Sequence, residues 1–225
     1  INENILSSEY YDNLSNDREK NFRYQFKDNI NFKNIQFNYG ENQENKIFDN
    51  LNIEIKKHEI MGVFGPSGSG KSTFADLLSG LLAPTSGSIY LDGKNIVDNP
   101  YVLNTIFAYV PQSVYLLNDS IKNNITFGEE ADNLKLEKAI HLSQLSSFVE
   151  KAPNGTETIV GERGAKISGG QIQRIGIARA IYHESEILIF DESTNALDLK
   201  SENKIIEEIK ALKNSKTIIV ISHKL

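Results

Sequence analysis

The chain has no cysteine among its 225 residues, and its apolar runs are short. Without cysteine it forms no disulfide and binds no zinc or iron–sulfur cluster through thiolates. No run approaches the roughly 20 apolar residues of a membrane-spanning helix, and the opening stretch INENILSSEYYDN lacks the basic-then-apolar order of a secretory signal. We expect any membrane attachment to come from a partner or from a segment outside this sequence.

Positive charge is also scarce, since the chain has 24 lysines and arginines against 30 acidic residues, which gives a formal net charge of −6. This balance has the wrong sign for a chain whose affinity comes mainly from neutralising phosphates, so we expect no nucleic-acid partner. Hydrophobic residues make up 39% and charged residues 24%, which is near the globular average. The length then allows one large domain or two small ones with a sizeable core.

Hydrophobic periodicity divides the chain into a polar beginning and a folded remainder. Residues 1–30 are rich in Asn, Asp, Glu, Lys and Ser and show no sustained period, which indicates a linker. Two alternating stretches follow, 32–39 and 51–55, and they predict an antiparallel pair of strands. An apolar run, a glycine-rich turn and helical spacing from Ser72 to Leu82 then predict a strand, a loop and a helix.

The second half alternates between helices and strands. Helical periodicity between Asp119 and Phe148, with Asp132 placed to cap a helix, indicates a helical insert. The remaining predicted strands are 89–91, 106–110, 187–190 and 217–221, and the remaining helices are 169–182 and 201–212. Such alternation predicts an α/β fold with a mainly parallel sheet covered on both faces.

The residues GPSGSGKS fit the phosphate-loop pattern G-x-x-x-x-G-K-[ST] between the predicted strand and helix. Glycines let successive backbone N–H groups surround an anion, and the helix N-terminus adds partial positive charge. Lys71 would reach the β- and γ-phosphates, and the Ser72 hydroxyl would bind Mg²⁺. An ordinary glycine-rich turn is the alternative, and the flanking strand and helix argue against it. The candidate nucleotide-binding residues here are Gly65, Ser67, Gly68, Ser69, Gly70, Lys71, Ser72 and Thr73.

Two acids, Asp191 and Glu192, follow the apolar strand 187–190. The carboxyl ends of parallel strands face the nucleotide in such folds, so Asp191 is expected to hold Mg²⁺. Glu192 is then placed to polarise the attacking water as a catalytic residue. An acidic pair at a strand end is by itself more often a turn or a helix cap. Its place downstream of a phosphate loop favours the nucleotide role.

A second cluster of exposed N–H groups is predicted where the stretch ISGGQ opens the helix 169–182. A serine cap followed by glycines at a tight bend would explain the same residues. One chain cannot easily present two helix N-termini to one γ-phosphate from opposite sides, whereas a second copy can. The candidate residues are Ser168, Gly169, Gly170 and Gln171.

Together, the phosphate loop, ISGGQ and ILIFDE resemble the ATP-binding-cassette (ABC) family over residues 30–225. The resemblance implies a P-loop NTPase core with a mainly parallel sheet, an N-terminal antiparallel β subdomain and a helical insert. It also implies that ATP and Mg²⁺ lie between two cassettes paired head to tail, so that the ISGGQ stretch acts on the partner's ATP.

The resemblance also implies domain boundaries. Residues 1–30 would be a linker from a membrane domain outside this sequence, and residues 31–225 would be the nucleotide-binding domain, truncated at its C-terminus. Its core would comprise residues 31–111 and 185–225, with a helical subdomain at about 112–184.

Four further residues match family positions in order. Tyr39 lies where the family stacks an aromatic ring on adenine, although it would equally fit the alternating face of a strand. Gln112 matches the glutamine that contacts Mg²⁺ and the attacking water, with surface solvation as the alternative. Asp198 matches the acid of a loop that crosses the dimer interface. His223 matches the histidine that contacts the γ-phosphate, although a lone histidine at a strand end is more often a packed structural residue.

Two segments, 118–125 and 158–164, resemble the exporters within the family. They favour the ATPase domain of an exporter that moves or flips a substrate outward from the cytoplasmic face of the cell membrane. Its partners would be a second nucleotide-binding domain and a transmembrane domain. The alternative is a soluble ABC ATPase that clamps a macromolecule in DNA repair or on the ribosome. Ile167, Ser193, Asn195 and His58 depart from the family pattern, and none of them removes a phosphate, metal or water contact.

Overall fold

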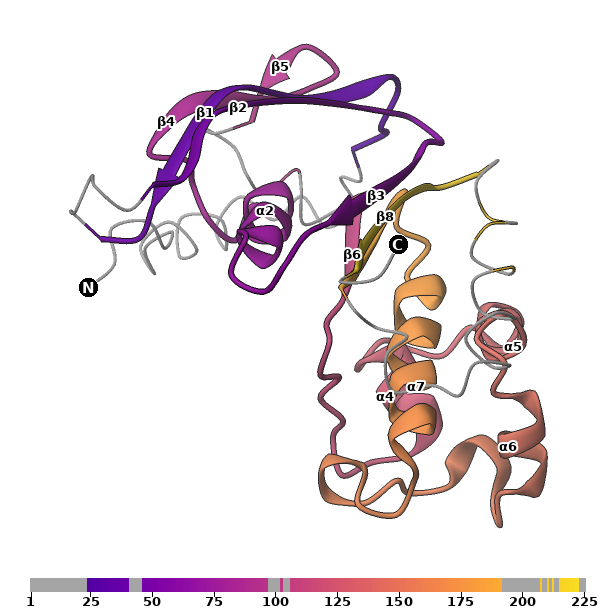
Figure 1. Ribbon diagram of the computed structural model, residues 1–225. Coiled ribbons are helices and arrows are strands. Elements are labelled where there is room, and N and C mark those ends of the chain that lie inside the picture. Colours follow the sequence, from indigo (N-terminus) through magenta and orange to yellow (C-terminus); the bar gives the residue numbers. More distant parts are fainter. Residues whose placement is uncertain are drawn as a thin grey trace, which may run out of the picture. The chain divides into compact units, whose positions relative to one another are not determined.

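The computed structural model describes residues 24–40, 46–96, 102, 106–191, 207, 210, 212 and 215–222 (Figure 1). The chain divides into two compact units. The first unit comprises residues 1–107 and 221–225, and the second comprises residues 108–220. Antiparallel and parallel sheets are both present, as the sequence predicts for this fold class. Among the described residues, no helix is both long enough and apolar enough to cross a membrane.

An antiparallel sheet with the strand order β2-β1-β4-β5 forms the first unit's main layer. Its strands are β1 (Asn29–Asn38), β2 (Lys46–Lys56), β4 (Ser86–Leu91) and β5 (Lys94–Asn95). β1 pairs with β2 from Asn29↔Lys56 onward, and the register shifts between Phe32 and Ile35. This irregularity adds one residue, so that Phe32 and Ile35 are both buried although they are three positions apart.

Helix α2 (Lys71–Leu78) follows strand β3 (Ile60–Phe64) and buries its apolar residues against the first unit's sheet. The rings of Phe74 and Phe32 lie 5.3 Å apart. The sequence predicted a helix that continues to Leu82, and this boundary is wrong. Gly80 adopts a left-handed φ of 74°, and the N–H groups of Gly80 and Leu81 bond back to the carbonyls of Leu77 and Asp76. This Schellman geometry ends the helix four residues earlier.

The Asp92 carboxylate, in the turn after β4, forms hydrogen bonds with the chain segment before β1. It accepts hydrogen bonds from the backbone N–H groups of Lys27, Asp28 and Asn29 at 2.8, 2.7 and 3.2 Å. The Tyr24 hydroxyl donates to it at 3.2 Å, and burial followed by the charge of Asp92 raises the pKa of that hydroxyl. Residues 24–30 therefore pack on the first unit, although the sequence analysis placed them in the linker.

The second unit combines a sheet with a group of helices. Strands β6 (Phe107–Val110), β7 (Ile187–Asp191) and β8 (Thr217–Ser222) lie mainly in this unit, in the order β8-β7-β6. β7 is buried along its whole length, as expected for a central strand. Among the described residues, the unit's helices include α4 (Ile121–Thr126), α5 (Asn133–Leu142), α6 (Ser146–Lys151) and α7 (Gly169–Tyr182), with 3₁₀ turns η1 (Gly155–Glu157) and η2 (Glu162–Gly164).

Helix α7 joins the two parts of the second unit. One side packs on the sheet in a cluster that includes Ile177, Leu188 and Phe190. On another side, Ile175 and Ala178 pack in a separate cluster, which lies among α4, α5 and α7. Because α7 packs in both clusters, its orientation is fixed. The position of its N-terminal residues is fixed with it.

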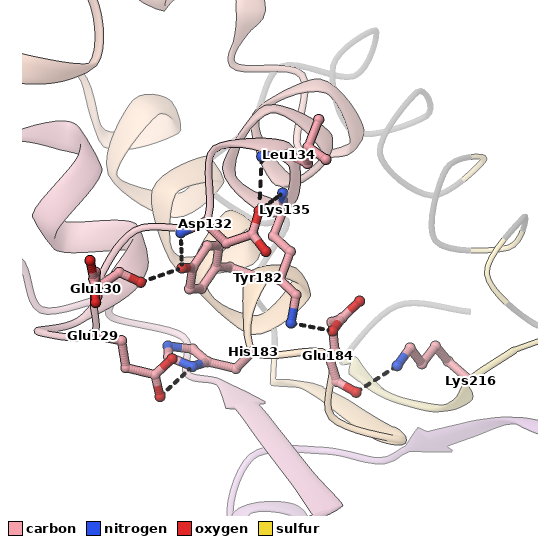
Figure 2. Close-up of polar contacts among 9 residues, drawn as sticks. All are labelled: Glu129, Glu130, Asp132, Leu134, Lys135, Tyr182, His183, Glu184 and Lys216. Carbon is pink, nitrogen blue, oxygen red and sulfur yellow. Dashed lines mark hydrogen bonds and ion pairs between the residues drawn. The ribbon is translucent and has the colours of Figure 1, made fainter.

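Side-chain caps start helices α5 and α7 where the sequence indicates them. The Asp132 carboxylate accepts bonds from the N–H groups of Leu134 and Lys135, which confirms it as the cap of α5. Figure 2 shows that the Tyr182 hydroxyl ties the end of α7 to the same turn, since it accepts from the Asp132 N–H at 3.0 Å. Lys135 also pairs with Glu184 at 2.6 Å, and this hydrogen bond lowers the pKa of the Glu184 carboxyl.

Candidate functional site

The phosphate loop joins β3 to α2 in the first unit. Its lysine folds back over the loop, because Lys71 Nζ donates to the carbonyls of Gly65 and Pro66 at 2.8 and 2.9 Å. Lys71 is 8% exposed, whereas Ser72 and the loop residues 67–69 are exposed. Gly70, with a φ of 91°, turns the chain into the helix in a conformation that disfavours other residues. The loop therefore exposes backbone and hydroxyl groups to a ligand, while the buried Lys71 is hydrogen-bonded to carbonyls of the same loop.

Tyr39 lies beside the start of α2. Its hydroxyl and the Thr73 Oγ1 are 3.0 Å apart, and its ring meets Phe37 edge-on at a centroid distance of 5.0 Å. The Tyr39 side chain still has 48% of its surface exposed. The structure thus brings together two predicted nucleotide-binding residues, Tyr39 and Thr73. It holds an exposed aromatic ring next to the phosphate loop, which is what base stacking requires.

Removing the ring in Tyr39→Ala is expected to weaken ATP binding by about 1–3 kcal/mol, the cost of losing one base–aromatic stack. Turnover of bound ATP should change less, because Tyr39 lies apart from the reacting γ-phosphate in this assignment. Titration of a fluorescent ATP analogue measures the affinity. Tyr39→Phe, which keeps the ring and loses the bond to Thr73, is the matched control and should bind nearly as well as the wild type. Equal affinity of Tyr39→Ala and wild type would contradict the stacking role.

Asp191 ends the central strand β7 of the second unit and is 6% exposed. The Tyr109 hydroxyl donates to its Oδ2 at 2.7 Å from the neighbouring strand β6. Gln112 lies just beyond the end of β6 and is exposed, and β6 is the strand next to β7, which Asp191 ends. Sequence analysis did not single out Tyr109. The available signal was that Tyr109 lies near the end of the predicted strand 106–110, as Asp191 immediately follows the predicted strand 187–190.

Three predicted site residues lie outside the described residues: Glu192, Asp198 and His223. Their assigned roles stay predictions from the sequence.

Ser168 caps helix α7, which confirms the serine-cap interpretation. Its Oγ accepts the N–H of Gln171 at 3.3 Å, and the Gln171 side chain accepts the Ser168 N–H at 2.8 Å. These reciprocal bonds form a capping box. Ser168 and Gly169 are nevertheless exposed, while Gly170 and Gln171 are half-buried. The helix start is therefore rigid and open to a second molecule at the same time.

The predicted Mg²⁺ ligands fit the ion by their chemistry. Ser72, Gln112 and Asp191 offer a hydroxyl, an amide carbonyl and a carboxylate, and Mg²⁺ prefers such oxygen donors. In the described part of the chain no group of three His, Cys, Asp or Glu side chains could hold a metal by itself. A single carboxylate suits Mg²⁺ that arrives with nucleotide phosphates and keeps several of its waters.

Comparison with known proteins identifies the family. The family model described as ABC transporter matches residues 48–195, a range that includes the phosphate loop, the α7 cap and β7. This chain belongs to the ABC transporter family. The family prediction and the predicted ABC ATPase fold are both confirmed, and the chain is the ATPase domain of such a protein.

Known ABC proteins similar to this chain include exporters and flippases. The ATP-dependent lipid A-core flippase of Ralstonia nicotianae is 39% identical over 201 residues, covering 87% of this chain and 34% of the flippase. The leukotoxin translocation ATP-binding protein LktB of Mannheimia glucosida is 42% identical over 200 residues, covering 87% of this chain and 28% of that protein. These relatives support the exporter interpretation over the soluble alternative.

A solved structure of a bacterial Atm1-family ABC exporter with ATP bound is similar throughout this ABC domain. It is 31% identical with a TM-score of 0.82, and the match covers 96% of this chain and 39% of that one. The chain spans about a third of the length of the relatives that it matches.

Proposed function

We propose that this domain binds ATP with Mg²⁺ and hydrolyses it to drive export or flipping of a substrate across a membrane. The phosphate-loop geometry carries the proposal, because Lys71 bonds back to a loop that exposes residues 67–69 at a helix N-terminus. Such a loop binds phosphates through backbone N–H groups and one cation. The similarity to exporters adds support for coupling to transport.

Each predicted residue has a task in this proposal. Lys71 and the phosphate loop hold the β- and γ-phosphates, and Tyr39 stacks on the adenine. Ser72, Gln112 and Asp191 would hold Mg²⁺, which would neutralise the phosphate charge that develops during transfer. Glu192 orients and polarises the attacking water, and Gln112 and His223 contact the water and the γ-phosphate. Since phosphoryl transfer needs little covalent help from the protein, positioning by these groups is the main contribution.

A second copy of the cassette, or a related one, completes the site. In the proposal, the cap of α7 in one protomer faces the γ-phosphate bound by the other, and Asp198 lies in the loop that crosses the interface. Loss of the γ-phosphate then removes a contact that both chains share, so hydrolysis releases the dimer. The transmembrane domain of the same or a partner chain converts this opening into movement of the substrate, with the cassette on the cytoplasmic face.

The decisive experiment uses the complete protein in lipid vesicles. Lys71→Ala is expected to lower ATP hydrolysis by about 100-fold or more, because it removes a preorganised cation from the phosphates. ATP-dependent movement of a fluorescent lipid between leaflets serves as the transport probe and should fall in parallel. Lys94→Ala, which changes an exposed lysine of β5, is the matched control and should behave like the wild type.

Normal hydrolysis in Lys71→Ala would contradict the ATPase assignment. A complete protein that lacks apolar spans, and whose hydrolysis responds to DNA or ribosomes, would favour the soluble clamp.

A further inference from the structure

A tyrosine and an aspartate meet where two neighbouring strands of the second unit end. Tyr109 on β6 and Asp191 on β7 are 82 positions apart in sequence, and the tyrosine hydroxyl donates to Asp191 Oδ2 at 2.7 Å. Asp191 is the one acid among the buried polar residues in the described part of the chain. A buried carboxylate is costly unless it is hydrogen-bonded or paired with a cation. The Tyr109 hydroxyl supplies a hydrogen bond to this carboxylate.

This hydrogen bond restricts how the carboxylate is oriented. Its length of 2.7 Å is normal for an O–H···O hydrogen bond. A carboxylate offers about four lone-pair sites, so a bond at Oδ2 is compatible with a cation at Oδ1. Carboxylates that bind metals are commonly held by such outer partners. The Tyr109 hydroxyl is placed to fill that role for Asp191.

We propose that Tyr109 is the positioning residue of the Mg²⁺ site, and that its hydroxyl holds the Asp191 carboxylate in the orientation that contacts the ion. The inference rests on the proposed function, which assigns Asp191 to Mg²⁺. Tyr109 acts through Asp191, so loss of the hydroxyl affects the ion more than the nucleotide. Phenylalanine at this position keeps the ring and removes the hydrogen bond.

The test compares Tyr109→Phe with wild type in the complete protein. With a non-hydrolysable ATP analogue fully protein-bound, Mn²⁺ is titrated as the metal probe, and free Mn²⁺ is counted by electron paramagnetic resonance. The Mn²⁺ dissociation constant is expected to rise about 10–100-fold, the usual effect of losing an outer partner of a metal ligand. The free Mg²⁺ concentration for half-maximal hydrolysis should rise similarly, while analogue binding in EDTA stays at the wild-type value.

Tyr90→Phe is the matched control, because Tyr90 is a half-buried strand tyrosine in the first unit. It should leave metal affinity unchanged. A double variant separates positioning from a general structural effect. If Tyr109 acts through Asp191, adding Tyr109→Phe to Asp191→Asn weakens Mn²⁺ binding no further, whereas independent effects would add.

Wild-type Mn²⁺ affinity in Tyr109→Phe, or additive effects in the double variant, would overturn this inference and leave the proposed function standing. Absence of Mg²⁺-dependent hydrolysis in the wild-type protein would instead overturn the proposed function itself.

Discussion

Mixing the Lys71→Ala and Ser168→Arg forms of the complete protein is expected to restore roughly a quarter of wild-type ATP hydrolysis, although each form alone is inactive. In a head-to-tail homodimer, the mixed dimer carries both changes in one site and neither in the other. Random pairing makes about half of the dimers mixed, and each of these has one intact site of two. Strong coupling between the two sites would lower the recovery.

The structure shows why Ser168 suits this test. It is exposed at the start of α7, where a partner's nucleotide could reach it, and its side chain also caps the helix. Arginine therefore obstructs the surface but also loses the cap, which costs about 1 kcal/mol. Ser168→Thr keeps the hydroxyl and the cap, so it is the matched control and should stay largely active.

The measurement is steady-state hydrolysis at several mixing ratios, with mixed dimers verified by native mass spectrometry. No recovery at any ratio, once strong coupling is excluded, would show that each site is complete within one chain. The roles proposed for Ser168, Gly169, Gly170 and Gln171 toward the partner's ATP would then be wrong.

Glu192→Gln should reduce hydrolysis by about 100- to 10,000-fold, the usual contribution of a general base, while ATP still binds. The amide keeps the shape of the side chain and loses the charge that polarises the attacking water. Since bound ATP then persists, the variant should accumulate as an ATP-dependent dimer. Hydrolysis rate and dimer fraction by light scattering measure both effects.

Glu186→Gln is the matched control for this change, because Glu186 immediately precedes the other end of β7. It should retain the wild-type rate. Near-normal turnover in Glu192→Gln would remove Glu192 from the catalytic role.

Local sequence signals located the elements with helical periodicity and side-chain caps. Helix α7 spans 169–182 as predicted, and Asp132 and Ser168 cap the helices that the sequence assigned to them. These features depend on residues within about one helical turn, so the sequence reveals them directly. The end of α2 was missed, because Gly80 forms a Schellman turn inside an apolar pattern that continues to Leu82.

The phosphate loop and the acidic strand end could likewise be recognised from sequence, since their spacing is set by the backbone geometry that phosphates require. The side-chain contacts that orient these residues could not be recognised from the sequence. Tyr39 meets Thr73 across 34 positions, and Tyr109 meets Asp191 across 82.

The sequence alone therefore determined the family and the α/β class, and it predicts which residues face ATP, because each rests on short-range patterns. The tertiary structure decided which side chains hold those residues in place: Thr73 beside Tyr39, Tyr109 on Asp191, and Asp92 on the chain before β1. Such partners come from strand pairing and helix packing between distant segments. Their hydroxyls and carboxylates carry no local pattern that distinguishes them from ordinary polar residues.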